Sequence, residues 1–215
     1  MIKSLEKIKS VQNRDVELLE FASTEKAKTV LIIGVFHGDE PQGETLIRKF
    51  LEERKTECKN RLLIIPCLNP DGKILNTRQN ANGVDLNRNF PTKNYEVVDD
   101  EHYFGGKKPA SEPETQFMIN VLEKYKIDFI LSLHTPYKIV NYDGDAEHIA
   151  KKISEYTNYP VEADIGYPTP GSFGTYAGKE RKIPTITLEL ADDISDDELW
   201  NNVKGIFDYC ADEFK

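Results

Sequence analysis

Short apolar runs along the chain alternate with segments whose apolar residues recur at helical spacing. Four runs consist almost wholly of β-branched and aliphatic residues, a pattern typical of strands buried on both faces of a sheet; they are residues 29–36, 61–68, 128–134 and 184–190. Apolar stripes of helical period occupy residues 41–54, 112–125, 146–157 and a C-terminal segment that contains Leu199, Val203, Ile206, Phe207 and Cys210. Strands that alternate with helices predict an α/β sandwich around a mostly parallel sheet.

Local signals refine this pattern at two places. Ser111 directly precedes the stripe of residues 112–125, and Glu114 lies three residues after Ser111. This spacing predicts a capping box at the start of that helix. Residues 69–109, in contrast, are rich in Asn, Asp, Gly and Pro and show no period. A loop of this length inside a compact domain is usually functional or disordered. Because no linker or repeat divides the chain, we expect one domain over residues 1–215.

Composition and charge exclude several classes of protein. The chain has 215 residues, of which 28 are Lys or Arg and 37 are Asp or Glu, and residues 192–215 alone carry eight acidic side chains against two lysines. We interpret that acidic segment as the solvated face of the C-terminal helix, and the acidic balance argues against a nucleic-acid partner. The apolar runs are too short to span a membrane, and the start lacks an apolar signal segment, so a cytoplasmic protein is expected. Cys58, Cys67 and Cys210 are odd in number and lack motif spacing, which predicts neither a disulfide framework nor a Cys-based metal site.

Side chains that bind metals lie at the ends of three predicted strands. His37 and Glu40 directly follow residues 29–36, His134 closes a second run, and Glu189 lies near the end of a third. In α/β sheets, ligands bind beyond the carboxyl ends of the strands. Two imidazoles and one carboxylate suit a catalytic zinc site whose fourth position holds water, and a further carboxylate would act as general base. Taken singly, each residue also fits a buried core histidine or a capping carboxylate.

The remaining candidate polar residues lie in the long loop and on a helix. Arg78, Asn87 and Arg88 add guanidinium and amide groups to the loop. An arginine fork would hold a substrate carboxylate or a developing oxyanion, although salt bridges within an ordered loop explain these residues equally well. His102, in an acidic stretch, and His148, on a helix, are predicted to be solvated.

Seven short motifs occur together along the chain. They are HGDE, NPDG, NANGVDLNRNFP, ASEPET, SLHTP, YPTPGSFG and the LEL around Glu189, and they span roughly residues 29–192. In this order they resemble the M14 zinc carboxypeptidase family. The resemblance implies a single-domain α/β/α sandwich around a mixed, mostly parallel twisted sheet.

The resemblance also assigns a role to each candidate residue. His37, Glu40 and His134 match the ligands of one Zn²⁺ per chain. Glu189 matches the glutamate that takes the proton from the activated water and passes it to the leaving amine.

Four further residues match positions that contact the substrate in this family. Asn87 and Arg88 match the pair that binds the free carboxylate of the departing residue. Arg78 resembles the arginine that polarises the scissile carbonyl, and Tyr167 resembles a mobile tyrosine that closes over the substrate.

The function implied by the resemblance is a zinc-dependent peptidase or amidase. It would hydrolyse the γ-D-glutamyl–meso-diaminopimelate bond of murein tripeptide in the cytoplasm, during recycling of cell-wall peptides, and its partner would be a small peptide with a free carboxylate. Three alternatives remain: a deacylase resembling aspartoacylase and succinylglutamate desuccinylase, a metallocarboxypeptidase for ordinary L-residues, and a binding protein without activity. The sequence leaves open whether diaminopimelate or lysine is released, the oligomeric state, and whether residues 94–108 form a lid.

Overall fold

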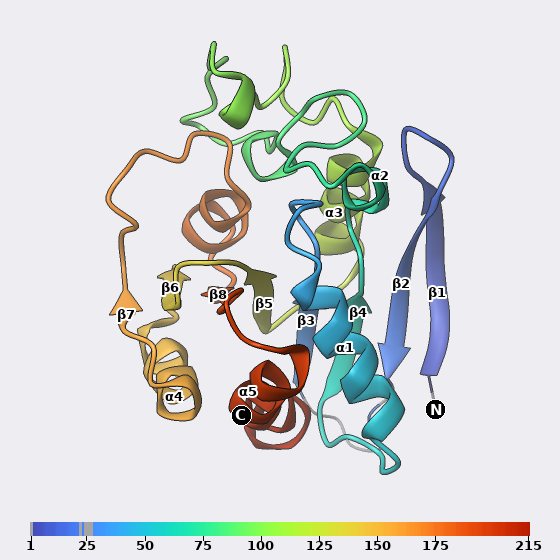
Figure 1. Cartoon of the computed structure of the whole chain (residues 1–215), viewed down its shortest axis with the longest axis vertical. Coiled ribbons are helices and arrows are strands. Elements are labelled where there is room, and N and C mark those ends of the chain that lie inside the picture. The colour runs from blue at the N-terminus through green and yellow to red at the C-terminus, as the bar shows by residue number, and fades with distance from the viewer. Residues whose placement is uncertain (1, 22, 24–27) are drawn as a thin grey trace.

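The structure, a computed structural model, describes residues 2–21, 23 and 28–215. Within this part of the chain, eight strands form one sheet in the order β1-β2-β4-β3-β5-β8-β6-β7 (Figure 1). The strands are β1 (Ile2–Lys9), β2 (Asp15–Phe21), β3 (Thr29–Ile33), β4 (Arg61–Ile65), β5 (Phe129–His134), β6 (Ile139–Asp143), β7 (Val161–Glu162) and β8 (Thr185–Glu189). The α-helices are α1 (Gln42–Glu53), α2 (Pro70–Leu75), α3 (Pro113–Lys124), α4 (Glu147–Thr157) and α5 (Asp196–Asp208).

The centre of the sheet is parallel and its flanks are antiparallel. β4, β3, β5 and β8 run parallel to one another, whereas β2 pairs antiparallel with β4 and β6 pairs antiparallel with β8. The four predicted apolar runs are therefore the four central strands. This mixed sheet confirms the predicted fold class.

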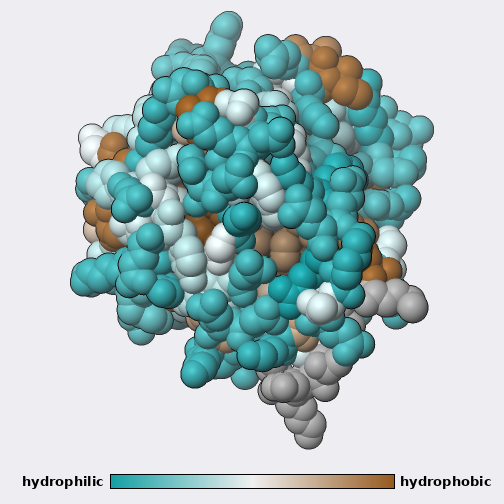
Figure 2. Space-filling model, turned by 60° about the horizontal axis from the view of Figure 1, so that its bottom comes forward, coloured by the Kyte–Doolittle hydropathy of each residue, from teal (hydrophilic) through white to brown (hydrophobic). Residues whose placement is uncertain are grey.

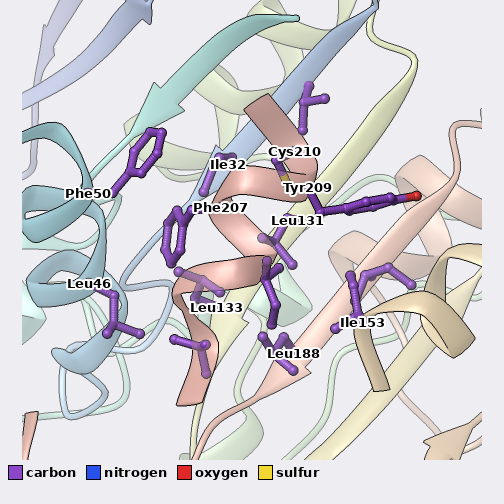
Figure 3. Close-up of a cluster of buried hydrophobic side chains, with 14 of the residues drawn as sticks. Ile32, Leu46, Phe50, Leu131, Leu133, Ile153, Leu188, Phe207, Tyr209 and Cys210 are labelled. Atoms are coloured by element: carbon purple, nitrogen blue, oxygen red, sulfur yellow. The ribbon is translucent and has the colours of Figure 1, made fainter. Parts of the chain in front are cut away.

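Side chains of the central strands alternate between two apolar cores, one on each face of the sheet. Val30 and Ile32 pack with residues of α1, α4 and α5, whereas Leu31 and Ile33 pack with residues of α3. Figure 3 shows part of the first core, where Phe50 of α1 lies beside Phe207 of α5, with ring centroids 5.3 Å apart. Because both faces are buried, these strands read as continuous apolar runs.

The predicted capping box at the start of α3 is wrong. The residue before the helix is Glu112, whose side chain makes no capping bond, and Pro113 occupies the first helical position. The Ser111 hydroxyl donates to Glu112 Oε1 (2.6 Å). Glu114 instead accepts hydrogen bonds from Asn80 Nδ2 (3.2 Å) and from the backbone N–H of Val11 (3.4 Å), so contacts with distant loops replace the local cap.

Several elements were not predicted from the apolar pattern. The β1–β2 hairpin, β6 and β7 are new, as is a π-helix over Thr175–Glu180. The segment of residues 69–109 is not wholly irregular, since it contains α2 and 3₁₀ turns at Leu86–Arg88 and Glu101–Tyr103. In Figure 1 this green segment and the orange segment after β7 gather at the top of the view, where β3 points. The long loops therefore meet at the carboxyl ends of the parallel strands.

The surface of the protein carries mostly polar residues, as the short apolar runs and the acidic C-terminal segment predict. No described helix is long and apolar enough to cross a membrane. The face shown in Figure 2 is mostly hydrophilic, with hydrophobic residues in small separate groups. Asp196, Asp197 and Asp208 of α5 are exposed, which confirms that acidic residues form the solvated face of this helix.

Candidate active site

Three side chains from two strand ends meet at the carboxyl edge of the sheet. His37 and Glu40 lie in the turn after β3, and His134 is the last residue of β5. Glu40 Oε1 is 2.7 Å from His37 Nδ1, and Glu40 Oε2 is 2.9 Å from His134 Nδ1. One donor atom from each residue lies within 4.8 Å of the other two, and all three side chains are buried. Among the described residues, this is the group with the geometry of a metal site.

The turn that carries His37 and Glu40 packs tightly on the start of α2. A Cβ atom added to Gly38 would lie 1.9 Å from the carbonyl carbon of Gly72, a separation that real side chains do not adopt. Upstream of the turn, Val35 has φ of 55°, a left-handed conformation rarely seen for a β-branched residue, and its carbonyl accepts from the N–H of Asn69 (2.9 Å). Backbone contacts with residues 69–72 thus fix the position of both ligands.

A buried aspartate that the sequence analysis missed orients His37. Asp85 Oδ1 is 3.1 Å from His37 Nε2, which leaves Nδ1 directed toward the other ligands. Burial alone would lower the pKa of His37, but the Glu40 and Asp85 carboxylates raise it to about 9. Burial raises the pKa of Asp85, yet His37 and Arg78 outweigh it and hold that pKa well below the usual range. Asp85 lies two residues before Asn87, and only its contact with His37 across the fold identifies it.

The donor set of the cluster fits zinc. Two imidazole nitrogens and a carboxylate oxygen are ligands that zinc prefers, and three protein ligands leave a fourth position for water or substrate. The carboxylate behind His37 is typical of histidines that bind a metal. Burial raises the pKa of Glu40, but His37 and His134 override it, so the pKa of this carboxyl lies well below its ordinary value and an anionic ligand is present.

Glu189 lies beside the cluster with one oxygen unpaired. It ends β8 and is the register partner of His134. Among the described residues, no hydrogen-bond partner is found for its buried Oε2 atom. Burial, together with the nearby Glu40 carboxylate, raises the pKa of Glu189 to about 8. A half-buried carboxylate with one unpaired oxygen and a raised pKa is suited to taking up and releasing a proton.

The predicted guanidinium and amide groups line the same cavity as Glu189. Arg78 donates through Nε to Asp85 Oδ2 (2.9 Å), and its Nη1 is 3.7 Å from Glu40 Oε1. Asn87 Oδ1 accepts a hydrogen bond from the N–H of Phe173 (2.9 Å), so the amide nitrogen of Asn87 takes no part in this bond. Arg88 is buried and donates through Nη1 to the Asn87 carbonyl (2.7 Å).

One tyrosine packs against both arginines, and a second tyrosine lies beside the first. The ring centroid of Tyr103 is 5.4 Å from the guanidinium carbon of both Arg78 and Arg88, so this ring, which was not predicted, packs against both cations. Tyr167 lies 6.2 Å from Tyr103 between ring centroids and is 37% exposed. His102 is exposed, as predicted.

The structure brings all eight predicted site residues to one cavity of about 870 Å³. They are His37, Glu40, Arg78, Asn87, Arg88, His134, Tyr167 and Glu189. His148 is exposed on α4 and does not line the cavity, in agreement with its predicted solvation.

Comparisons with known proteins identify the family of the chain. The model of the zinc carboxypeptidase family, peptidase family M14, matches residues 2–214, and the chain therefore belongs to this family of metallopeptidases. Among relatives, it is 36% identical over 181 residues to murein peptide amidase A of Vibrio campbellii, a match that covers 79% of this chain and 72% of that protein. It is 32% identical over 180 residues to murein peptide amidase A of Escherichia coli K12 (78% of this chain, 73% of that protein). The crystal structure of a murein-tripeptide amidase from Escherichia coli O157 superposes with a TM-score of 0.80 at 28% identity, covering 93% of this chain and 87% of that one.

Proposed function

We propose that this protein is a zinc-dependent amidase that hydrolyses the γ-D-glutamyl–meso-diaminopimelate bond of murein tripeptide. The observation that carries the proposal is the meeting of three candidate ligand side chains, a carboxylate with one unpaired oxygen and two arginines in one cavity. The names of the relatives supply the substrate class. We further propose that the enzyme acts in the cytoplasm on recycled cell-wall peptides, as one domain over residues 1–215.

The arginines and Asn87 would place the substrate. Arg88 and the Asn87 amide nitrogen would bind the free α-carboxylate of the residue that is released, because a guanidinium and an amide offer parallel donors to a carboxylate. This grip directs the scissile amide toward His37, Glu40 and His134 at the carboxyl edge of the sheet. Tyr167, which is partly exposed on the cavity rim, would cover the bound peptide.

His37, Glu40 and His134 would hold zinc, and Glu189 would move the proton. Zinc, when bound there, would polarise the scissile carbonyl and lower the pKa of a water molecule toward neutrality. Glu189 takes a proton from the attacking water and returns it to the leaving amine nitrogen. Arg78 donates to the oxyanion that develops on the carbonyl oxygen, and Asp85 holds the guanidinium in place through Nε.

The test is the release of amine from three substrates by zinc-loaded protein. Incubation with L-Ala-γ-D-Glu-meso-diaminopimelate, with N-acetylaspartate and with an ordinary L-peptide is followed by mass spectrometry. Release of diaminopimelate from the first substrate alone is expected. Cleavage of only N-acetylaspartate or only the L-peptide would move the assignment to a deacylase or a general carboxypeptidase.

A matched variant links the activity to this cavity. In Arg88→Ala the substrate carboxylate loses a charged donor, so KM should rise by about 10- to 100-fold while one zinc per chain is retained. An unchanged KM would remove Arg88 from carboxylate binding. Lys151→Met, which breaks an exposed ion pair with Glu147 on α4, serves as the control and should behave as the unmodified protein.

A further inference from the structure

An ion pair that none of the proposed catalytic steps uses lines the same cavity as Glu189. Lys179 Nζ is 3.0 Å from Asp143 Oδ1. The Asp143 side chain is 12% exposed and that of Lys179 is 57% exposed, so the carboxylate is recessed and the ammonium covers it. Both residues line the cavity.

The sheet register places Asp143 on the same face as Glu189. β6 runs antiparallel to β8, with Ile139 opposite Glu189, Asn141 opposite Thr187 and Asp143 opposite Thr185. Alternate residues of a strand share a face, so Glu189, Thr187, Asn141 and Asp143 follow one another along one wall. Four residues of strand separate Asp143 from the position beside Glu189, about 13 Å between Cα atoms at 3.3 Å per residue. The pair therefore lies further along this wall from Glu189, within the same cavity, where only a long substrate side chain with a polar end would reach it.

Two glycines make room for the Asp143 carboxylate. A Cβ atom on Gly174 would lie 2.0 Å from Asp143 Oδ2, and one on Gly178 would lie 2.5 Å from Asp143 Cβ. Gly174 directly precedes the π-helix of Thr175–Glu180, and Gly178 lies within this helix, which also carries Lys179. Any side chain at these positions would displace the carboxylate. The backbone of residues 174–178 thus packs closely around the Asp143 carboxylate, which is paired with the Lys179 ammonium.

We infer that Asp143 and Lys179 select the side chain of the residue that is released, and that they recognise an amino-acid end bearing both an ammonium and a carboxylate. The ligand ammonium binds the recessed Asp143, and the ligand carboxylate binds Lys179, so the internal ion pair is exchanged for two intermolecular ones. The exchange leaves no charge unpaired, which limits the desolvation cost. This inference rests on the proposed function, and it names diaminopimelate rather than lysine as the released residue.

The arrangement discriminates against lysine for a simple reason. A lysine side chain carries the ammonium but no carboxylate, so Lys179 would lose its partner and face a second cation. Unpaired charges and like charges brought together are an effective means of rejecting a wrong ligand. A site meant for lysine would present Asp143 alone.

The test compares three tripeptides that differ only at the released residue. L-Ala-γ-D-Glu is joined to meso-diaminopimelate, to L-lysine or to L-norleucine, and kcat/KM is measured for the zinc-loaded protein, Lys179→Met, Asp143→Asn and the control Lys151→Met. In Lys179→Met, kcat/KM for diaminopimelate should fall by about 10- to 100-fold while that for lysine is unchanged or higher. In Asp143→Asn, the values for both charged substrates should fall and that for norleucine should stay within about twofold.

Two outcomes would overturn the inference. One is an equal loss for all three substrates in Lys179→Met, since a purely structural ion pair would affect them alike; the other is an unchanged preference in both variants. If the unmodified protein cleaves no γ-D-glutamyl peptide, the proposed function fails, and calorimetric titration with free meso-diaminopimelate and L-lysine decides the inference separately. Binding of diaminopimelate that Lys179→Met weakens would sustain it, and binding of neither amino acid would overturn it.

Discussion

Two clusters that each contain a carboxylate lie near the turn that carries His37 and Glu40, and they differ in how fully that carboxylate is hydrogen-bonded. Under the β1–β2 hairpin, Asp71 accepts hydrogen bonds from the Ser10 hydroxyl (2.8 Å), the Gln12 N–H (2.8 Å) and Arg14 Nη1 (2.7 Å). In the cavity, Glu189 is half-buried, and no hydrogen-bond partner for its buried Oε2 atom is found among the described residues.

The difference separates a structural cluster from a reactive one. A fully paired buried carboxylate stabilises the folded state and has no remaining capacity for a ligand. A carboxylate left unpaired costs stability, and such groups gather where a ligand or a proton completes the arrangement. Changes in the Asp71 cluster should therefore alter stability, whereas changes around Glu189 should alter chemistry.

The largest effect is expected for Glu189→Gln. Loss of the general base should lower kcat for the murein tripeptide by about 10²- to 10⁴-fold. Zinc content, measured by atomic absorption, should stay at one per chain, because the glutamine leaves all three ligands in place. Turnover near that of the unmodified protein would remove Glu189 from the role of base.

The next effect concerns the metal. In Asp85→Asn, His37 keeps a neighbour at Nε2 but loses the charge that fixes its orientation, so zinc affinity should fall by about 10- to 100-fold. Competition with a chelator of known affinity measures the change. Unaltered zinc affinity in a folded Asp85→Asn protein would contradict the assigned orientation of His37.

Asp71→Asn tests the other side of the comparison. The variant weakens three hydrogen bonds, one of them charged, and leaves the partly exposed Arg14 without its anion, so the free energy of unfolding should fall by about 2 kcal/mol. Urea denaturation measures this, and kcat per folded molecule should be unchanged. Asp197→Asn, at an ion pair with Lys49 in which Asp197 is 88% exposed, is the matched control and should leave the free energy of unfolding unchanged.

The unpaired carboxylate also predicts a pH dependence for metal-free protein. The folded state raises the pKa of Glu189 from 4.5 to about 8. The stability that the bound proton contributes is therefore present below pH 4.5 and is lost as the pH rises through 8. Glu189→Gln lacks this loss, so its Tm should match the unmodified protein near pH 4.5 and exceed it by roughly 5 °C above pH 8. A constant difference across this range, followed by calorimetry, would contradict the raised pKa.

The smallest effect is expected at Tyr103, whose ring packs against both arginines. Tyr103→Leu removes two cation–π contacts, so KM should rise by about 3- to 10-fold with little change in kcat. Tyr103→Phe keeps the ring and should retain the original KM. Equal effects of the two substitutions would show that the hydroxyl, rather than the ring, matters.

The sequence predicted those parts of the fold that are buried on both sides. The central strands are continuous apolar runs because each face meets a core, whereas β1 (IKSLEKIK) is largely exposed and β6 places Asn141 and Asp143 toward the cavity. Because β1 and β6 contain these polar residues, they do not form continuous apolar runs and were not predicted. The site residues that lie at strand ends or within a motif were likewise predicted from the sequence, and the structure brings them to one cavity. Asp85, Tyr103 and the Asp143–Lys179 pair were not, because contacts between distant segments define them.

The close contact of Gly38 with Gly72 links the Asp71 cluster to the turn that carries His37 and Glu40. Asp71 precedes Gly72 and is tied to the hairpin, while Gly38 follows His37, so the hairpin serves as an anchor for the ligand turn. An insertion or a bulky side chain at either glycine would displace the backbone of the turn, and this displacement would reach the adjacent His37. Engineering of this protein should therefore treat HGDE, NPDG and the hairpin tip as a single module, exchanged whole or left intact.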